Sequence, residues 1–193
     1  MNGLRDYSGE FNPNIRIEDF SEDTLGKLAK LYSKLLIGAD GFWYLAVKEN
    51  LSDEMATACD LWAWDKYIRY EISHLTRLLN IKGTKVVSLL KAFQFSAWLQ
   101  NCQYKVEAKD DNFAVLTIAF CPTLSALERE GEGREKKFCE SVEPSMFKMY
   151  ANYFNPDIEV RPLKLPPRKS KKEICCQWEF RMGQSPGGRM DDS

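Results

Sequence analysis

The feature of this sequence that most constrains its fold is a change in the spacing of its apolar residues near residue 103. Before this point apolar residues recur every three or four positions, as on the buried face of an α-helix; after it they alternate with polar residues, as in a β-strand with one wet face. A chain of 193 residues is long enough to bury one core. We therefore predict a single α+β domain over residues 1–182, helical over 19–95 and built on a sheet over 103–182.

The helical part is expected to open with two helices separated by a glycine-bearing break. Ser21 is a preferred N-cap residue, and it precedes an apolar stripe typical of a half-buried helix: Leu25, Leu28, Leu31, Tyr32, Leu35 and Leu36. Gly38 and the pair Asp40-Gly41 are expected to end this helix, because glycine is a poor helix former. A second, short helix is then expected over 42–50.

The longest predicted helix runs from Ser52 to about Leu79. Its apolar residues have the spacing of a helix that packs on another helix: Leu61, Trp64, Ile68, Ile72, Leu75 and Leu79. It also carries His74, the only histidine of the chain, which fits a half-buried structural position. A further helix is expected to pass through Phe93.

The second half is predicted to be an antiparallel sheet with a helical stretch packed on it, in the order β-β-α-β-β. Residues 113–120 are apolar on both faces, which is typical of an inner strand. In the helical stretch 124–154, a polar glycine-bearing segment is expected to break the helix. Pro144 is expected to restart it, because proline suits a first helical turn. Residues 183–193 are expected to be a disordered tail.

Charge and composition exclude several classes of partner. Lys plus Arg number 27 and Asp plus Glu 28, so the chain lacks the positive excess expected of a nucleic-acid or membrane-surface protein. No apolar run approaches the roughly 20 residues that span a bilayer, and the N-terminal residues do not resemble a secretion signal. We expect a cytoplasmic protein with reduced cysteines.

Four thiols are the main candidates for chemistry, because a strand end, the crossing helix and the last strand should bring them together: Cys121, Cys139, Cys175 and Cys176. With a carboxylate or His74 they could hold zinc. Alternatively, a cation such as Arg134 or Lys137 could lower the pKa of one thiol and make it a nucleophile. The third reading is that these thiols only pack as small apolar groups.

The alternation of residues 174–182 separates the two adjacent thiols. Cys176 shares a face with Trp178 and Phe180 and is expected to lie in the core, whereas Cys175 shares the polar face and is expected to see solvent or a polar pocket. Two nearby carboxylates, Glu128 and Glu132, are candidates for general acid–base work, against the alternative of a solvated charged loop.

The second half also resembles a known family. Its element order, the Cys-Pro that ends the 113–120 strand, the cysteine in the middle of the helical stretch and the final CCQWEF are similar to the C-terminal module of the L-2-amino-thiazoline-4-carboxylic acid hydrolase-like family. That family in turn resembles ligand-binding domains related to 4-vinyl reductase. The whole chain resembles a set of uncharacterised bacterial and archaeal cytosolic proteins in the stretches DGFWYLAVKE, KAFQFSAWLQ, CPTLSALEREGEGREKKFCE, YFNPDIEV, LKLPPR and CCQWEF.

The resemblance implies a hydrolase acting on a C–N bond of a small cyclic substrate. It carries over Cys139 and either Cys175 or Cys176 as site residues, and the doublet leaves open which of the two corresponds. We predict Cys139 and Cys175 as the catalytic thiols, assisted by Glu128 or Glu132. The alternatives are a non-catalytic ligand- or zinc-binding domain that uses the same thiols, and a structural protein in which they only pack. The expected partner is a small molecule, and the sequence leaves open whether the chain forms a homodimer.

Overall fold

The computed structural model describes residues 3–183 and confirms the α+β fold class. Residues 184–193, which make up nearly all of the tail expected to be disordered, lie outside the described residues. The elements are α1 (Glu22–Asn50), α2 (Asp53–Leu78), α3 (Val86–Phe93), β1 (Gln103–Asp110), β2 (Phe113–Phe120), α4 (Pro122–Glu130), α5 (Arg134–Phe154), β3 (Ile158–Lys164) and β4 (Cys176–Met182), with short 3-10 turns at Ile17–Asp19 and Leu99–Asn101.

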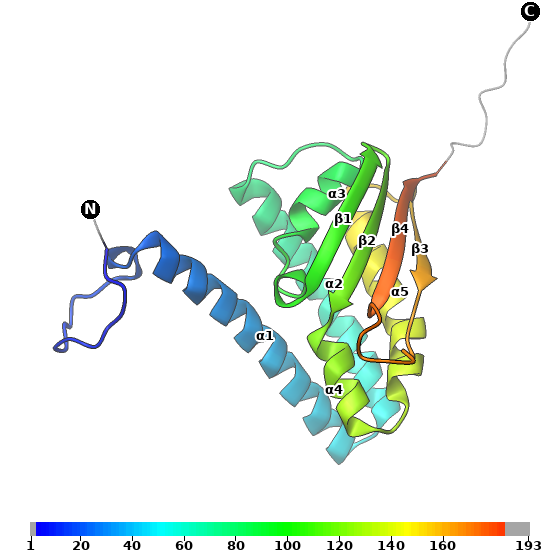
Figure 1. The fold of residues 1–193 in the computed structure, drawn as a ribbon, viewed down its shortest axis with the longest axis horizontal. Coiled ribbons are helices and arrows are strands. Elements are labelled where there is room, and N and C mark those ends of the chain that lie inside the picture. Colours follow the sequence, from blue (N-terminus) through cyan, green and yellow to red (C-terminus); the bar gives the residue numbers. More distant parts are fainter. Residues whose placement is uncertain (1–2, 184–193) are drawn as a thin grey trace, which may run out of the picture.

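The four strands form one antiparallel sheet in the order β1-β2-β4-β3. The prediction that residues 113–120 form an inner strand is confirmed. One face of β2, with Ala114, Leu116 and Ile118, is fully buried, and the other face is only partly covered up to Thr117. Helices α2, α3 and α5 lie on the buried side of the sheet (Figure 1). The helical part of the chain therefore packs on one face of the sheet.

The prediction of a break at Gly38 is wrong, because α1 is one helix of 29 residues that runs through Gly38 and Gly41. A glycine inside a helix costs only about 1 kcal/mol, and contacts with the rest of the chain offset this cost. Ser33 donates a hydrogen bond to the Ala97 carbonyl (2.6 Å), and Tyr44 donates one to the Asp53 carboxylate (2.8 Å). The N-terminal half of α1 projects from the body (Figure 1), and no residue of α1 is buried.

The prediction that Pro144 restarts a helix is also wrong. Pro144 lies inside α5, which begins ten residues earlier at Arg134. The break between α4 and α5 lies at Gly131 and Gly133, whose φ angles of 73° and 72° are in the left-handed region that glycine adopts without steric cost. The glycines of the segment, and not the proline, therefore decide where the chain turns.

A buried carboxylate, that of Glu71 on α2, joins three parts of the core. It accepts hydrogen bonds from the hydroxyl of Tyr67 (2.9 Å), the backbone N–H of Ala97 (2.7 Å) and the hydroxyl of Tyr150 on α5 (2.9 Å). Burial raises the pKa of Glu71, and the three hydrogen bonds oppose that rise. These bonds fix α2 against α5 and against the segment that leads into β1.

Replacing Glu71 with alanine should lower the free energy of unfolding by about 3 kcal/mol, because it leaves the Tyr150 hydroxyl and the Ala97 N–H without their shared acceptor. Urea denaturation measures this difference. The matched control is Glu49→Ala, at an exposed position near the end of α1, which should change stability little. A Glu71→Ala protein as stable as the control would show that the hydrogen bonds do not organise the core.

Candidate functional site

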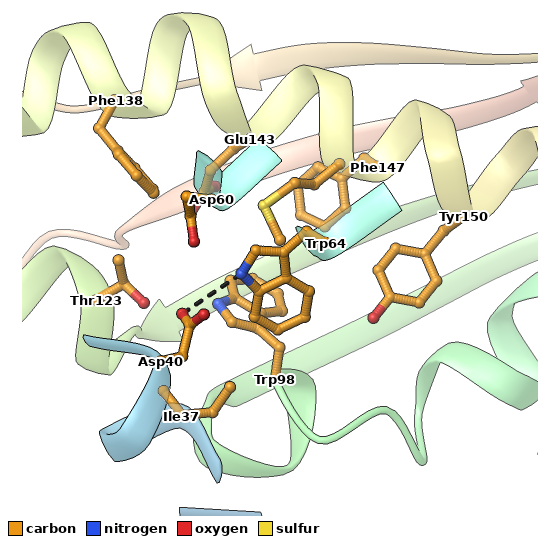
Figure 2. Close-up of a pocket in the computed structure, with 11 residues that line it drawn as sticks. Ile37, Asp40, Asp60, Trp64, Trp98, Thr123, Phe138, Glu143, Phe147 and Tyr150 are labelled. Carbon is orange, nitrogen blue, oxygen red and sulfur yellow. Dashed lines mark hydrogen bonds between the residues drawn. The ribbon is translucent and has the colours of Figure 1, made fainter. Parts of the chain in front are cut away.

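A cavity of about 40 Å³ lies between α1, α2, α4 and α5, with Trp98 on a further side (Figure 2). This volume holds roughly two or three water-sized groups. We call it the acidic cavity, because three carboxyl groups reach it: Asp40, Asp60 and Glu143. Aromatic side chains form most of the remaining wall: Trp64, Trp98, Phe138, Phe147 and Tyr150.

Helical spacing places these groups in the cavity. Asp60 and Trp64 are four residues apart on α2, and Glu143 and Phe147 are four residues apart on α5. Residues at this spacing lie on the same helix face, so each of the two helices presents a carboxyl group beside an aromatic ring. Asp40 completes the set from the face of α1 that turns toward the body.

Asp40 and Asp60 form a pair of carboxyl groups with raised pKa values. Burial raises the pKa of Asp40, while a weak hydrogen bond from the Trp64 indole N–H (3.4 Å) lowers it. Burial, and then the neighbouring Asp40, raise the pKa of Asp60 to about 7. Within residues 3–183, no lysine or arginine is close enough to offset these effects.

Glu143 is the most deeply enclosed of the three carboxyl groups. Its side chain is 5% exposed, and its Oε2 atom has no hydrogen-bond partner. In the part of the chain that the structure describes, only the Trp178 indole nitrogen shares this condition. Burial raises the pKa of Glu143 well above its usual value. An unpartnered carboxyl oxygen in such a place is costly unless something fills the position beside it.

The four predicted thiols lie in the core close to one another. Burial raises the pKa of Cys139, and Glu143, Cys121, Cys176 and Cys175 are all near enough to raise it further. Burial likewise raises the pKa of Cys176. An unreactive protonated thiol is the expected state of such groups, so their surroundings do not favour a thiolate nucleophile.

The prediction that Cys175 sees solvent is wrong, because the residue is only 1% exposed. The alternative of a polar setting has some support: burial raises the pKa of the Cys175 thiol, and Arg168 is near enough to oppose that rise. The strand begins at Cys176, so Cys175 belongs to the preceding loop and the alternation of the strand does not apply to it. Its thiol donates a hydrogen bond to the Ala119 carbonyl (3.3 Å). Cys176 lies in the core as predicted.

Cys121 differs from the other thiols of the core. It is the N-cap of α4, and hydrogen bonds from Cys102 and from the N–H groups of Leu124 and Thr123 lower its pKa against the effect of burial. Among residues 3–183, no group of three or more His, Cys, Asp or Glu side chains is arranged to hold a metal ion. The zinc hypothesis therefore gains no geometric support from the described residues.

The predicted acid–base residues lie in ion pairs outside the acidic cavity. Arg168 holds both oxygens of Glu128 at 2.8 and 2.6 Å and lowers its pKa, and Lys48 holds Glu132 at 2.9 Å with the same effect. Carboxylates stabilised in the ionised form are poor general acids.

His74 is exposed rather than half-buried, and its ring lies against Tyr70.

Sequence reasoning missed all three carboxyl groups of the acidic cavity. The signal was a charged residue at a position whose helical neighbours are apolar. Asp60 precedes Trp64 and Ile68 at steps of four, and Glu143 lies between Cys139 and Phe147 at the same steps. Charged residues are almost never fully buried unless paired, so such positions mark candidate sites.

Comparisons with known proteins identify a family without an assigned activity. Residues 18–182 match the model of the family of unknown function DUF6125. No curated protein and no solved structure matches the chain. The comparisons therefore support the expectation of an uncharacterised family, and they give no support to the resemblance to the hydrolase-like family or to 4-vinyl reductase. None of the helices within residues 3–183 has the length and apolar character needed to cross a membrane.

Stability should fall as the pH rises through neutrality, because Asp60 has a pKa of about 7 in the folded protein against 3.8 as its usual value. Between these two values the folded protein holds a proton that the unfolded chain has released. Raising the pH from about 5 to about 8 should therefore lower the free energy of unfolding by on the order of 2 kcal/mol. Urea denaturation at both pH values should show a smaller fall for Asp60→Asn, with Asp157→Asn as the exposed control.

The reactivity of the thiols follows from their burial. Cys59 is exposed and should react with a maleimide in the native protein, whereas Cys121, Cys139, Cys175 and Cys176 should be protected until the chain is denatured. Peptide mass spectrometry after timed labelling measures each site. Labelling of Cys139 or Cys175 as fast as that of Cys59 would restore the nucleophile hypothesis.

Proposed function

We propose that this chain, which belongs to the DUF6125 family, binds a small organic cation in the acidic cavity. The observation that carries the proposal is the Glu143 Oε2 atom, which is buried beside the cavity without a hydrogen-bond partner. A donor from a ligand would supply the missing partner and remove the cost of leaving the oxygen unpaired.

The chemistry of the wall favours an ammonium or related organic group over other ligands. Asp40, Asp60 and Glu143 are all acceptors when ionised, and no protein cation lowers their pKa values. Aromatic faces such as those of Trp64 and Trp98 attract cations through their ring quadrupoles. An anion would meet like charges, and the lack of a metal-binding arrangement among the described residues disfavours a bare metal ion.

The cavity volume limits what enters. About 40 Å³ accommodates an ammonium or methylated ammonium group and little more, so a larger ligand would have the rest of its structure outside. The partly buried residues Ile37, Thr123 and Met146 also line the cavity and would contact the part of the ligand that lies inside it. The proposal therefore specifies the charged group of the ligand and leaves the remainder of the molecule open.

Binding should release protons. A cation favours the ionised carboxylates, so ligand and proton compete for the same groups. Asp60, with a pKa of about 7, is half protonated near neutrality. The affinity for the cation should therefore increase as the pH rises through about 7.

The test is isothermal calorimetry with alkyl- and arylammonium ions from methylammonium to benzylammonium, each compared with the neutral alcohol of the same shape. The ammonium ions should bind and the alcohols should not. Glu143→Gln keeps the shape of the side chain and removes its charge, and it should weaken ammonium binding at least about tenfold. Glu140→Gln, at an exposed position of the same helix, is the matched control and should bind like the parent.

Two outcomes would contradict the proposal. Equal binding of the ammonium ion and the alcohol would show that the cavity selects for shape alone. Ammonium binding that survives Glu143→Gln would place the ligand elsewhere on the molecule.

A hydrolase acting on a C–N bond of a small cyclic substrate is a second candidate. The observation that favours it is the pKa of Asp60, since about 7 suits a general acid–base group at neutral pH. In this candidate Asp60 would accept a proton from the attacking water and return it to the leaving nitrogen. Turnover of a cyclic amidine that Asp60→Asn abolishes without loss of binding would favour the enzyme over the binding protein.

A further inference from the structure

Helix α1 presents a long apolar surface that nothing in the described residues covers. Large side chains along it remain exposed: Leu31, Tyr32, Leu35, Leu36, Phe42, Trp43 and Leu45. The exposed fractions reach 76% for Phe42 and 71% for Trp43. Single exposed apolar residues are ordinary, but a contiguous row over several helical turns marks an interaction surface.

The row has the spacing of a helix-pairing seam. Steps of three and four residues alternate without interruption through Leu25, Leu28, Tyr32, Leu35, Ala39, Phe42 and Ala46. This is the heptad pattern that keeps one face of a helix against another helix. The opposite face of α1 holds Ser33, Asp40 and Tyr44, which bond to the body of the domain. The seam is therefore the outer face of α1, and we call it the α1 seam.

We propose that a second copy of this chain covers the α1 seam, with the two α1 helices antiparallel about a two-fold axis. A two-fold axis places the same surface on both sides of the contact, so one self-complementary seam is sufficient. The N-terminal half of α1 projects beyond the body (Figure 1), and in this arrangement it lies along the body-bound half of the other α1.

Side-chain volume favours the antiparallel direction. With the axis near Ile37, Leu35 of each copy faces Ala39 of the other and Tyr32 faces Phe42, so leucine fills the space beside alanine. In a parallel pair the alanines would face each other and leave gaps in the seam.

The exposed apolar area of the α1 seam is large enough for a stable dimer. Tyr32, Phe42 and Trp43 are 58%, 76% and 71% exposed, so at about 200 Å² per aromatic side chain they contribute roughly 400 Å² from each copy. Standard interfaces bury about 800 Å² per partner, and the leucines and neighbouring residues of α1 supply the remainder. A membrane surface is the weaker alternative, because lipid requires no heptad spacing and the net charge of −1 gives no attraction to anionic lipid.

Sedimentation velocity of the full chain tests the proposal. The parent should sediment as a dimer and Leu35→Glu as a monomer, because the new charge lies in the centre of the seam. Lys34→Glu places a glutamate at the adjacent exposed position, away from the seam; it changes the net charge by two units instead of one and should still remain a dimer. Circular dichroism should show unchanged helix content in both variants, since Leu35 is 56% exposed within one copy. A monomeric parent, or a dimer that survives Leu35→Glu, would overturn the proposal, and a monomer that sediments with anionic vesicles would assign the seam to lipid.

Cross-linking tests the direction of the pair. In a Cys59→Ser background, which removes the exposed native thiol, Leu35→Cys and Ala39→Cys proteins are mixed and oxidised. Antiparallel pairing predicts disulfide-linked heterodimers in excess over either homodimer. An excess of homodimers would overturn the antiparallel arrangement.

Discussion

The hydrogen bonds to the Glu71 carboxylate are the constraint on which the rest of the domain depends. Through them α2 is tied to Tyr150 of α5 and to the Ala97 N–H, and that segment leads directly into the sheet. The aromatic side chains around this point then pack on one another, with Phe93 against Tyr150 and Phe147 against Trp178. Because three donors satisfy the carboxylate, a charged group can occupy the core without leaving α2 free to shift.

Glu143 is a second buried glutamate, but it lacks the hydrogen-bond donors that surround Glu71. Both glutamates are buried on helices that face the core, yet Glu71 has three donors and the Oε2 atom of Glu143 has none. Structural carboxylates in a core are surrounded by their partners within the fold, whereas binding and catalytic ones are often completed from outside. The difference between the two residues is the physical reason for giving Glu71 a structural role and for proposing that the acidic cavity binds a ligand.

The sequence contains most of the fold but little of the candidate site. Periodicity is enough to predict the helical first half, the inner position of residues 113–120 and the buried face of Cys176, because each depends on which side of one element is apolar. The continuity of α1 through Gly38 depends on bonds from Ser33 and Tyr44 to distant residues, which spacing does not reveal. The acidic cavity is harder still to predict, because Asp40, Asp60 and Glu143 lie on three helices and form a common site only where those helices pack together.

The way α1 is attached has a consequence for the kinetics of the acidic cavity. The helix forms one wall of that cavity through Asp40, but it buries no residue of its own, and polar contacts such as that of Lys48 with Glu132 hold it to the body. Apart from partly buried residues such as Ile37, few apolar contacts join this helix to the core, so its opening should cost less free energy than unfolding of the sheet and α5. If the acidic cavity binds a cation as proposed, the opening of α1 would limit the rate at which the cation reaches the buried carboxyl groups, and association would be slow even for a tight complex.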